Sequence, residues 1–253
     1  MQIAGRYRLE HPAEWLHHLF WGALDWLYPP QCGGCQTLGT RWCSQCHSDC
    51  RRIISGCSRC GRPEPSPSSV CAECAAQPPA FDALLSWAIY TGPLRLAILR
   101  LKYHQDVGLG EIFAQSLIEL YQQVNWPVDQ IVPVPLSADH AWERGYNQST
   151  LLARPLALHL RIPLRPRALR RTRITQAQVG LNAQERRENV SRAFMADPHD
   201  VAGKSMLIVD DVTTTGATMQ ACAQALRDAG ARSVYGLTLA RAAHPSPDGD
   251  QQP

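Results

Sequence analysis

From residue 83 onwards, the hydrophobic positions of the chain fall into two kinds of segment. Short apolar runs predict strands at 83–90, 129–135, 206–209 and 233–240. Longer segments between them predict helices at 92–103, 111–124, 147–160 and 219–230. Because strands and helices alternate, the pattern predicts an α/β fold with a mainly parallel sheet. Ligands are then expected at the carboxyl ends of the strands.

The chain before residue 80 has a different pattern. Apolar residues between Trp15 and Leu27 recur at helical spacing, which predicts an amphipathic helix that packs on the protein's own body. Docking to a membrane or a partner is the alternative. Prolines mark a boundary near residue 80. The predicted parts are an N-terminal amphipathic segment (1–28), a cysteine-rich module (29–80), an α/β domain (81–243) and a polar, disordered tail (244–253).

Composition adds few constraints to this picture. The chain has 253 residues, 45% of them hydrophobic and 19% charged, with a net charge of +3. This balance indicates a globular protein without strong overall attraction to polyanions. Only two of the 25 basic residues are lysines, Lys102 and Lys204, and arginine favours bidentate phosphate contacts. Without a recognisable signal peptide or a run of 18 apolar residues, we expect a cytoplasmic protein with no membrane span.

Cysteine is concentrated in the module at 29–80. Nine of the ten cysteines lie between Cys32 and Cys74, and without a secretion signal metal ligation explains them better than disulfides. Eight form C-x-x-C pairs, the spacing at which a tight turn presents two thiolates to one tetrahedral ion. The predicted Zn²⁺ ligands are Cys32, Cys35, Cys43, Cys46, Cys57, Cys60, Cys71 and Cys74. Four thiolates complete each site, so both ions are predicted to be structural.

The pairing of these ligands has two solutions. Sequential sites close short loops and are the favoured arrangement, whereas a cross-braced arrangement would alternate the pairs. His47 and Cys50 are possible substitute ligands, although the four pairs complete two sites without them. Cys222 lies on a predicted helix and is expected to be a packed core thiol.

The stretch from Met206 to Thr218 carries the clearest chemical signal. Four apolar residues lead to Asp210 and Asp211 at the expected strand end, and a threonine-rich loop and a helix follow. Such a loop holds phosphate, because backbone N–H groups and the positive end of the helix dipole point at the anion. The predicted phosphate-binding residues are Thr213, Thr214, Thr215, Gly216, Ala217 and Thr218. The loop has no lysine, unlike that of nucleoside-triphosphate P-loops.

The two carboxylates favour a phosphorylated sugar over phosphate alone. From a solvent-facing strand end, Asp210 and Asp211 can accept hydrogen bonds from vicinal ribose hydroxyls. The stretch resembles the signature of type I phosphoribosyltransferases, which bind phosphoribosyl pyrophosphate (PRPP). The alternative is an acidic strand end that binds only Mg²⁺, as in a receiver-like domain, and the Thr-Thr-Thr-Gly-Ala-Thr loop argues against it.

Three further segments carry groups that suit a pyrophosphate. Arg144 precedes a predicted helix and is expected to hold a pyrophosphate oxygen; the alternative is a helix cap by Asn147 with Arg144 in solvent. Lys102, at a helix end, either reaches a phosphate or interacts with the helix dipole. The segment 170–181 contains three arginines and is predicted to be a loop that closes on the substrate, with a solvated linker as the alternative.

In combination these motifs resemble the ComF family, which includes competence-associated and gluconate-utilisation proteins of bacteria. The matching features are the paired cysteines, Leu101–Tyr103, Pro133–Pro135, Arg144–Gln148, Thr175-Gln176, Arg186–Val190 with Phe194, and Asp210–Thr218. The resemblance implies a double zinc ribbon fused to a type I phosphoribosyltransferase-like domain. It also implies a role in DNA uptake or the use of extracellular DNA, with other competence proteins as partners.

Two functional hypotheses follow. In the first, the protein is an enzyme that binds Mg²⁺–PRPP, with Asp210, Asp211, Arg144 and Lys102 as its catalytic groups. In the second, a non-catalytic protein keeps the PRPP-type pocket and binds single-stranded DNA. Trp42 is then available to stack on a base, although a packed Trp is commoner in a small ribbon. The expected phosphate contacts are Arg161, Arg165, Arg167, Arg170, Arg171 and Arg173.

Overall fold

The computed structural model describes residues 29–63, 70–137, 142–172 and 193–243. The predicted amphipathic segment, the predicted tail, Thr175-Gln176 and Arg186–Val190 lie outside these residues. No helix in the described ranges has the length and apolarity that a membrane crossing requires.

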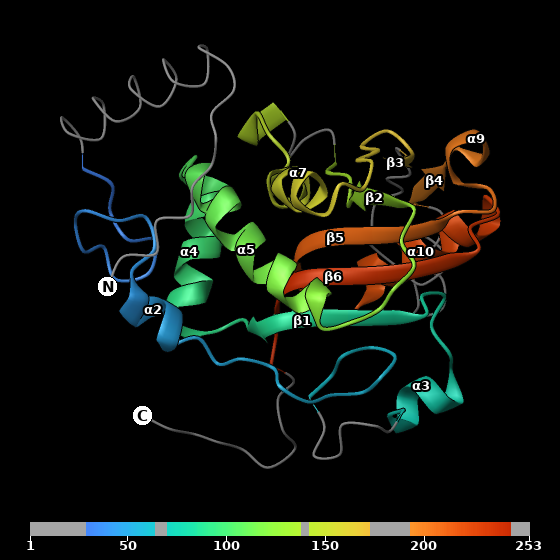
Figure 1. The fold of residues 1–253 in the computed structure, drawn as a ribbon, viewed down its shortest axis with the longest axis horizontal. Coiled ribbons are helices and arrows are strands. Elements are labelled where there is room, and N and C mark those ends of the chain that lie inside the picture. The colour runs from blue at the N-terminus through green and yellow to red at the C-terminus, as the bar shows by residue number, and fades with distance from the viewer. Residues whose placement is uncertain (1–28, 64–69, 138–141, 173–192, 244–253) are drawn as a thin grey trace, which may run out of the picture.

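A four-stranded parallel sheet forms the centre of the α/β body, in the order β1-β6-β5-β2 (Figure 1). Its strands are β1 (Ala83–Ile89), β2 (Gln130–Pro133), β5 (Ser205–Thr213) and β6 (Ser233–Arg241). The register places Ile131 opposite Leu207 and Leu237 opposite Val209. The predicted fold class is therefore confirmed.

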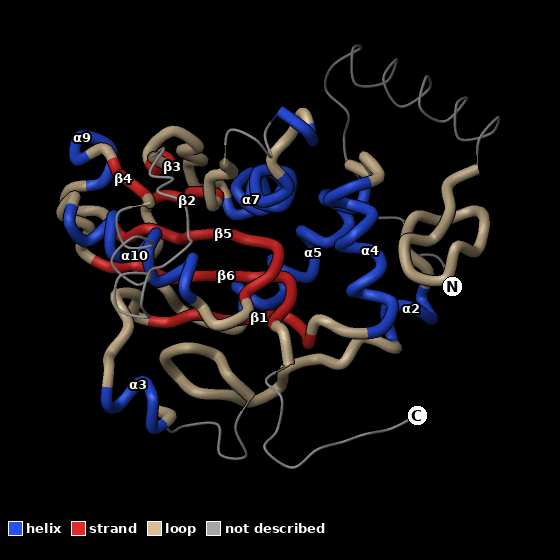
Figure 2. The backbone as a smooth tube through the Cα atoms, turned by 180° about the vertical axis from the view of Figure 1, so that it is seen from behind, coloured by secondary structure: helices blue, strands red, loops and turns tan. Residues whose placement is uncertain are grey.

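Helices cover both faces of the sheet (Figure 2). One core contains side chains of α4 (Gly92–Tyr103), α5 (Gly108–Gln122) and α7 (Gln148–Leu160), and the other contains those of α10 (Ala217–Asp228). Strand β5 serves both cores, because successive side chains of a strand point to opposite faces. Leu207 and Val209 pack in the first core, and Met206 and Ile208 pack in the second.

Strand β5 extends beyond its predicted end at Val209. Its pairing with β6 continues to Thr213, which lies opposite Arg241. Asp210 and Asp211 therefore lie inside the strand, with Asp210 opposite Thr238. The expectation that both carboxylates occupy a solvent-facing strand end is wrong for Asp211, which is only 2% exposed.

A second, antiparallel sheet was not predicted from the sequence. Strands β3 (Leu169–Arg171) and β4 (Phe194–Ala196) pair with each other, and the short helix α9 (Pro198–Val201) follows β4. Phe194 and Leu169 pack in the same core as α10. The predicted loop at 170–181 therefore begins as a strand, and its remainder from residue 173 lies outside the described residues.

The cysteine-rich module lies along the outer edge of β1. Ile53 N donates to Trp87 O (3.1 Å), Ile89 N to Arg51 O (2.8 Å) and Leu84 N to Arg59 O (2.7 Å). These bonds satisfy an edge that would otherwise present unpaired backbone groups. Gly61 allows the closest approach: it has φ of 67°, and a Cβ there would lie 2.3 Å from Leu84 O.

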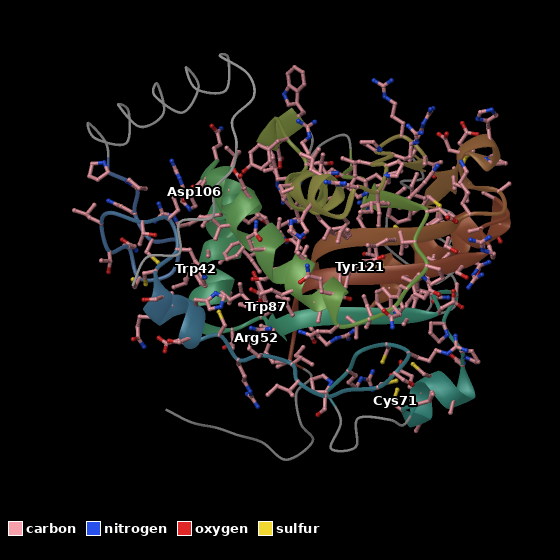
Figure 3. The ribbon with its side chains drawn as sticks, in the orientation of Figure 1. Trp42, Arg52, Cys71, Trp87, Asp106 and Tyr121 are labelled. Carbon is pink, nitrogen blue, oxygen red and sulfur yellow. The ribbon has the colours of Figure 1, made fainter. Side chains whose placement is uncertain are left out.

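Aromatic and ionic contacts fix the module to the α/β body (Figure 3). The guanidinium of Arg52 lies 4.5 Å from the ring centroid of Trp87, and Arg41 forms an ion pair with Asp106 at 3.2 Å. Trp42 contacts Phe113 edge to face at 5.1 Å between ring centroids. The packed alternative for Trp42 therefore has more support than base stacking.

Candidate functional site

The predicted phosphate loop joins β5 to α10. Gly216 is the N-cap of α10 and has φ of 84°, a left-handed conformation that favours glycine. The Thr215 hydroxyl accepts a hydrogen bond from Ala217 N at 3.3 Å. The loop encloses a cavity of about 50 Å³ lined by Asp210 and residues 212–219. Its small size and its place at a helix N-terminus suit a single phosphate group.

Asp210 lines this same cavity. Its Oδ1 atom accepts hydrogen bonds from Ser149 Oγ at 2.7 Å and from Asp211 N at 2.9 Å. Burial raises the pKa of Asp210 to about 8, and the neighbouring charge of Asp211 contributes to the increase. A ligand that binds the ionised carboxylate must therefore displace a proton at neutral pH.

Asp211 faces the other side of the sheet and forms an ion pair with Lys102. The two charged atoms are 2.5 Å apart, and the side chains are 3% and 19% exposed. Burial alone would lower the pKa of Lys102, but the charge of Asp211 and the hydrogen bond to it raise the pKa. Lys102 is therefore a cation held at the carboxyl end of the sheet, and its main partner is a carboxylate rather than the dipole of α4.

Arg144 is connected to the same group of residues. Its Nη1 atom donates to Gln148 Oε1 at 3.1 Å, and its guanidinium lies 4.9 Å from the ring centroid of Tyr103. Gln148 Nε2 in turn donates to Asp211 Oδ1 at 3.4 Å. The alternative that leaves Arg144 in solvent is therefore wrong. The accompanying cap is confirmed, because the side chain of Asn147 accepts from Ser149 N.

Sequence reasoning missed Gln148 and Ser149 as residues of the site. Both lie in the first turn of α7, are at most 5% exposed, and bond to Asp211 and Asp210 respectively. The sequence signal that could have identified them is their position directly after the Asn147 cap. Polar side chains that are buried at the start of a helix need hydrogen-bond partners nearby. The structure thus brings Asp210, Asp211 and Arg144 together through the first turn of α7, and Lys102 joins them through its ion pair with Asp211.

The eight paired cysteines form two clusters in sequential order. Within each cluster the sulfur atoms lie within 4.8 Å of one another. The clusters are Cys32, Cys35, Cys43 and Cys46, and Cys57, Cys60, Cys71 and Cys74. Four convergent thiols fit a tetrahedral Zn²⁺ ion. This grouping confirms the sequential pairing and excludes the cross-braced one.

Short helices position the second pair of each cluster. Cys43 caps α2 (Ser44–Ser48), and Cys71 is the N-cap of α3 (Ala72–Ala76). A hydrogen bond from Thr37 lowers the pKa of the Cys35 thiol to about 6. Burial opposes ionisation of Cys57, yet backbone N–H groups lower its pKa to about 6 as well. Burial raises the pKa of Cys46, Cys60 and Cys74 in the same clusters, so a bound metal ion is needed to hold all four sulfurs of a site as thiolates.

The other candidate thiols lie outside both clusters. Cys50 is buried and donates its S–H to Cys46 O at 3.2 Å. His47 accepts from Trp42 Nε1 at 3.4 Å and is no cluster member. Cys222 is fully buried in the core with α10, as predicted.

Comparison with known proteins places these features in a family. The phosphoribosyl transferase domain family matches residues 147–251. The chain is 37% identical to the DNA utilization protein YhgH of Salmonella typhi over 204 residues, which cover 79% of this chain and 89% of that protein. It is 31% identical to Competence protein F of Haemophilus influenzae, over 77% of this chain and 90% of that protein. It is 29% identical to Competence protein ComFC of Bacillus subtilis, over 79% and 83%. The chain belongs to the ComF family, in which a phosphoribosyltransferase-type domain follows a module with two four-cysteine clusters.

Proposed function

We propose that this protein binds PRPP in a phosphoribosyltransferase-type pocket and serves DNA utilisation or competence. One observation carries the first part: Asp210 lines the same cavity as the phosphate loop, so a ribose acceptor and a phosphate cradle face one ligand. The names of its relatives support the second part. In this proposal residues 29–80 form a double zinc ribbon and residues 81–243 form the PRPP-binding domain.

Each group has a role in this proposal. Residues Thr213–Thr218 bind the 5-phosphate, chiefly through the backbone N–H groups of the loop. Asp210 accepts from a ribose hydroxyl, and Asp211 is a second acceptor that also holds Lys102 in place. Lys102 and Arg144 stabilise the charge of the departing pyrophosphate as the anomeric C–O bond breaks. Mg²⁺ bound with PRPP would neutralise pyrophosphate charge, while the protein supplies orientation.

A calorimetric titration of the zinc-loaded protein with Mg²⁺–PRPP tests this proposal. Ribose 5-phosphate and pyrophosphate serve as partial ligands, and each should bind more weakly than PRPP because it fills only part of the site. Pyrophosphate release is then followed with a panel of bases and nucleotides. Release with one acceptor class would assign a phosphoribosyltransferase, and binding without release would favour the non-catalytic alternative. Absence of PRPP binding would overturn the proposal.

Single-stranded DNA binding is a second candidate, and one observation favours it. Arg161, Arg165, Arg167, Arg170 and Arg171 are all exposed, and none forms an ion pair within the described residues. Such arginines suit a phosphate backbone. Changing Arg165, Arg167 and Arg170 to Ala should weaken binding to a labelled oligonucleotide and reduce the log–log salt slope by about 2. An unchanged slope would exclude this surface.

A further inference from the structure

A second, larger cavity lies between the Cys57–Cys74 cluster and α10. Its volume is about 650 Å³, which is in the range of small-molecule sites. It shares residues 215–217 with the phosphate loop, its lining does not include Asp210, and it follows α10 as far as Gln224. The roles proposed above for PRPP leave the rest of this cavity unused.

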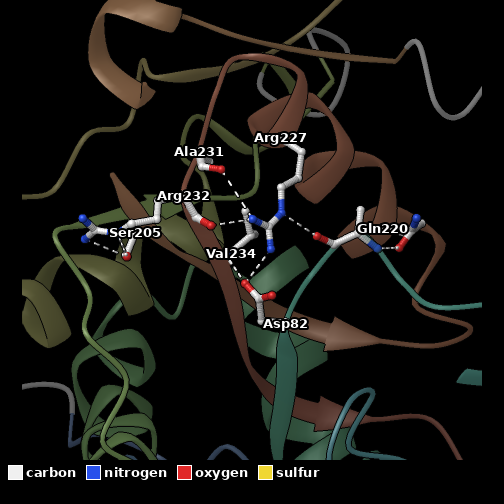
Figure 4. Close-up of polar contacts among 8 residues, drawn as sticks. Asp82, Ser205, Gln220, Arg227, Ala231, Arg232 and Val234 are labelled. Carbon is white, nitrogen blue, oxygen red and sulfur yellow. Dashed lines mark hydrogen bonds and ion pairs between the residues drawn. The ribbon is translucent and has the colours of Figure 1, made fainter. Parts of the chain in front are cut away.

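The walls of the cavity are held in place by hydrogen bonds (Figure 4). Pro78 and Pro79 form one wall, and the next residue, Ala80, is fixed at both backbone groups. Ala80 N donates to Gln220 Oε1 at 2.8 Å, and Arg227 Nε donates to Ala80 O at 3.1 Å. Arg227 also forms an ion pair with Asp82 at 2.6 Å. These bonds fix the position of the proline wall relative to α10.

Arg241 gives the cavity a buried positive charge. The residue is 3% exposed and lines the cavity, and its Nη2 atom donates to Cys60 O. Its Nε atom has no hydrogen-bond partner, and the residue forms no ion pair with a carboxylate in the described chain. Arg62, on the same wall, is instead paired with Glu73. The Nε atom of Arg241 is itself buried, so it is the positive charge of the guanidinium in the cavity wall that attracts an anionic group.

The remaining lining suits a flat ring with polar edges. Pro78 and Pro79 provide apolar surface, Phe81 and Leu84 are almost fully buried in the wall, and amide groups come from Gln220 and Gln224 on α10. Gln224 Nε2 donates to Asp228 Oδ1 at 2.8 Å, which leaves its Oε1 atom as an acceptor. The Oε1 atom of Gln220 is used by Ala80, which leaves its Nε2 atom to donate to a ligand. Amide side chains recognise the edges of nucleobases. A ring, a polar edge and one anion are the parts of a nucleotide.

We propose that this cavity binds a nucleoside monophosphate. The base packs between the apolar walls, its edge meets the amides of α10, and the phosphate meets Arg241. A free mononucleotide and the terminal nucleotide of a DNA strand share this chemistry. The site shares residues 215–217 with the phosphate loop, but its proposed base and phosphate contacts, on α10 and at Arg241, lie outside the residues assigned to PRPP.

Calorimetry with dAMP, dGMP, dCMP and dTMP on the zinc-loaded full chain tests the proposal. We expect at least one to bind one per chain, and its nucleoside without phosphate to bind about tenfold more weakly. The variant Gln224→Trp fills the cavity from a half-buried helix position and should weaken mononucleotide binding about tenfold. The control Gln122→Trp makes the same change at an exposed position of α5, across the sheet, and should have no effect.

Further experiments locate the bound nucleotide and distinguish a free mononucleotide from the terminal nucleotide of a DNA strand. Mg²⁺–PRPP affinity should be unchanged in Gln224→Trp, which separates this proposal from the PRPP proposal. A 5′-phosphorylated oligonucleotide that binds more tightly than any mononucleotide would assign the terminal nucleotide of a strand as the ligand. Arg241→Gln should reduce the preference for the phosphate, and Arg241→Lys should restore part of it. Any of three results would overturn the proposal. The first two are no saturation at millimolar mononucleotide and binding that Gln224→Trp does not affect. The third is an unchanged preference for the phosphate in Arg241→Gln, because Arg241 would then only compensate the charge of the cysteine cluster.

Discussion

The ion pair between Lys102 and Asp211 gives a sharp test of how the site is held together. In Lys102→Met, the carboxylate of Asp211 stays buried, with Gln148 as its remaining side-chain partner. Breaking a buried pair by removing one partner typically costs about 3–5 kcal/mol. Because the Lys102 side chain keeps 19% of its surface exposed, water reaches part of the pair, and we expect the lower end, about 3 kcal/mol. For a chain of this size, that loss lowers the Tm by about 6–12 °C.

The assay is urea unfolding of the zinc-loaded protein, followed by circular dichroism. The chain offers a matched control, Lys204→Met, because Lys204 forms no ion pair in the described chain and donates to two neutral oxygens, the Asp200 carbonyl at 2.8 Å and the Gln130 side chain at 2.9 Å. That variant should lose about 1–2 kcal/mol. The double variant Lys102→Met/Asp211→Asn removes both charges, and its loss should be about 2 kcal/mol smaller than the sum of the single losses. Additive losses, or a loss below about 1 kcal/mol for Lys102→Met, would refute the reasoning.

Four further predictions concern protons, metal and backbone. Because the pKa of Asp210 is raised to about 8, PRPP that binds its ionised form should lose affinity about tenfold per unit as the pH falls below 8, and Asp210→Asn should lack this dependence. Because of the same shift, the folded protein keeps a proton that the unfolded chain releases near pH ~4. The contribution of Asp210 to the free energy of unfolding should therefore decrease as the pH rises from about 4 to 8. Urea unfolding of wild type and Asp210→Asn at several pH values measures this decrease. Metal analysis should find two zinc ions per chain, one per cluster, and one ion in Cys57→Ser; a single ion in the wild type would contradict this. In Cys57→Ser, amide exchange should accelerate at Leu84, which bonds to Arg59 O, and stay slow at Leu237 in the sheet centre.

Local sequence patterns predicted most of the fold. The starts of β1, α4 and β6 and the end of α7 agree with the predicted positions, because hydrophobic periodicity and turn residues act over a few neighbours. The cysteine clusters could be predicted equally well, because C-x-x-C spacing is itself a local sequence pattern. The β3–β4 pair was not, because each strand has three residues and too little alternation to be recognised.

The site was predicted in its parts but not in its connections. The sequence identified Asp210, Asp211, Lys102 and Arg144 separately, whereas the docking of α4 and α7 on β5 decides which of them meet. The burial of Asp211 follows from the same docking. It decides which of the two aspartates can be substituted to test ligand binding. Asp211→Asn removes one charge of a buried ion pair and should cost stability, so it cannot isolate ligand binding. Asp210→Asn can, because Asp210 lines the phosphate cavity and forms no ion pair in the described chain.

Calorimetric titration of Asp210→Asn with Mg²⁺–PRPP therefore tests the central claim most directly. The experiment runs at pH 8.5, where the wild-type carboxylate is mostly ionised. Losing a charged hydrogen bond of about 1.5–3 kcal/mol predicts an affinity about 10- to 100-fold below wild type. Urea unfolding should show a folded variant at least as stable as wild type at this pH, because Asn carries no buried charge. PRPP affinity equal to wild type in a folded Asp210→Asn protein would contradict the assignment of this cavity to PRPP.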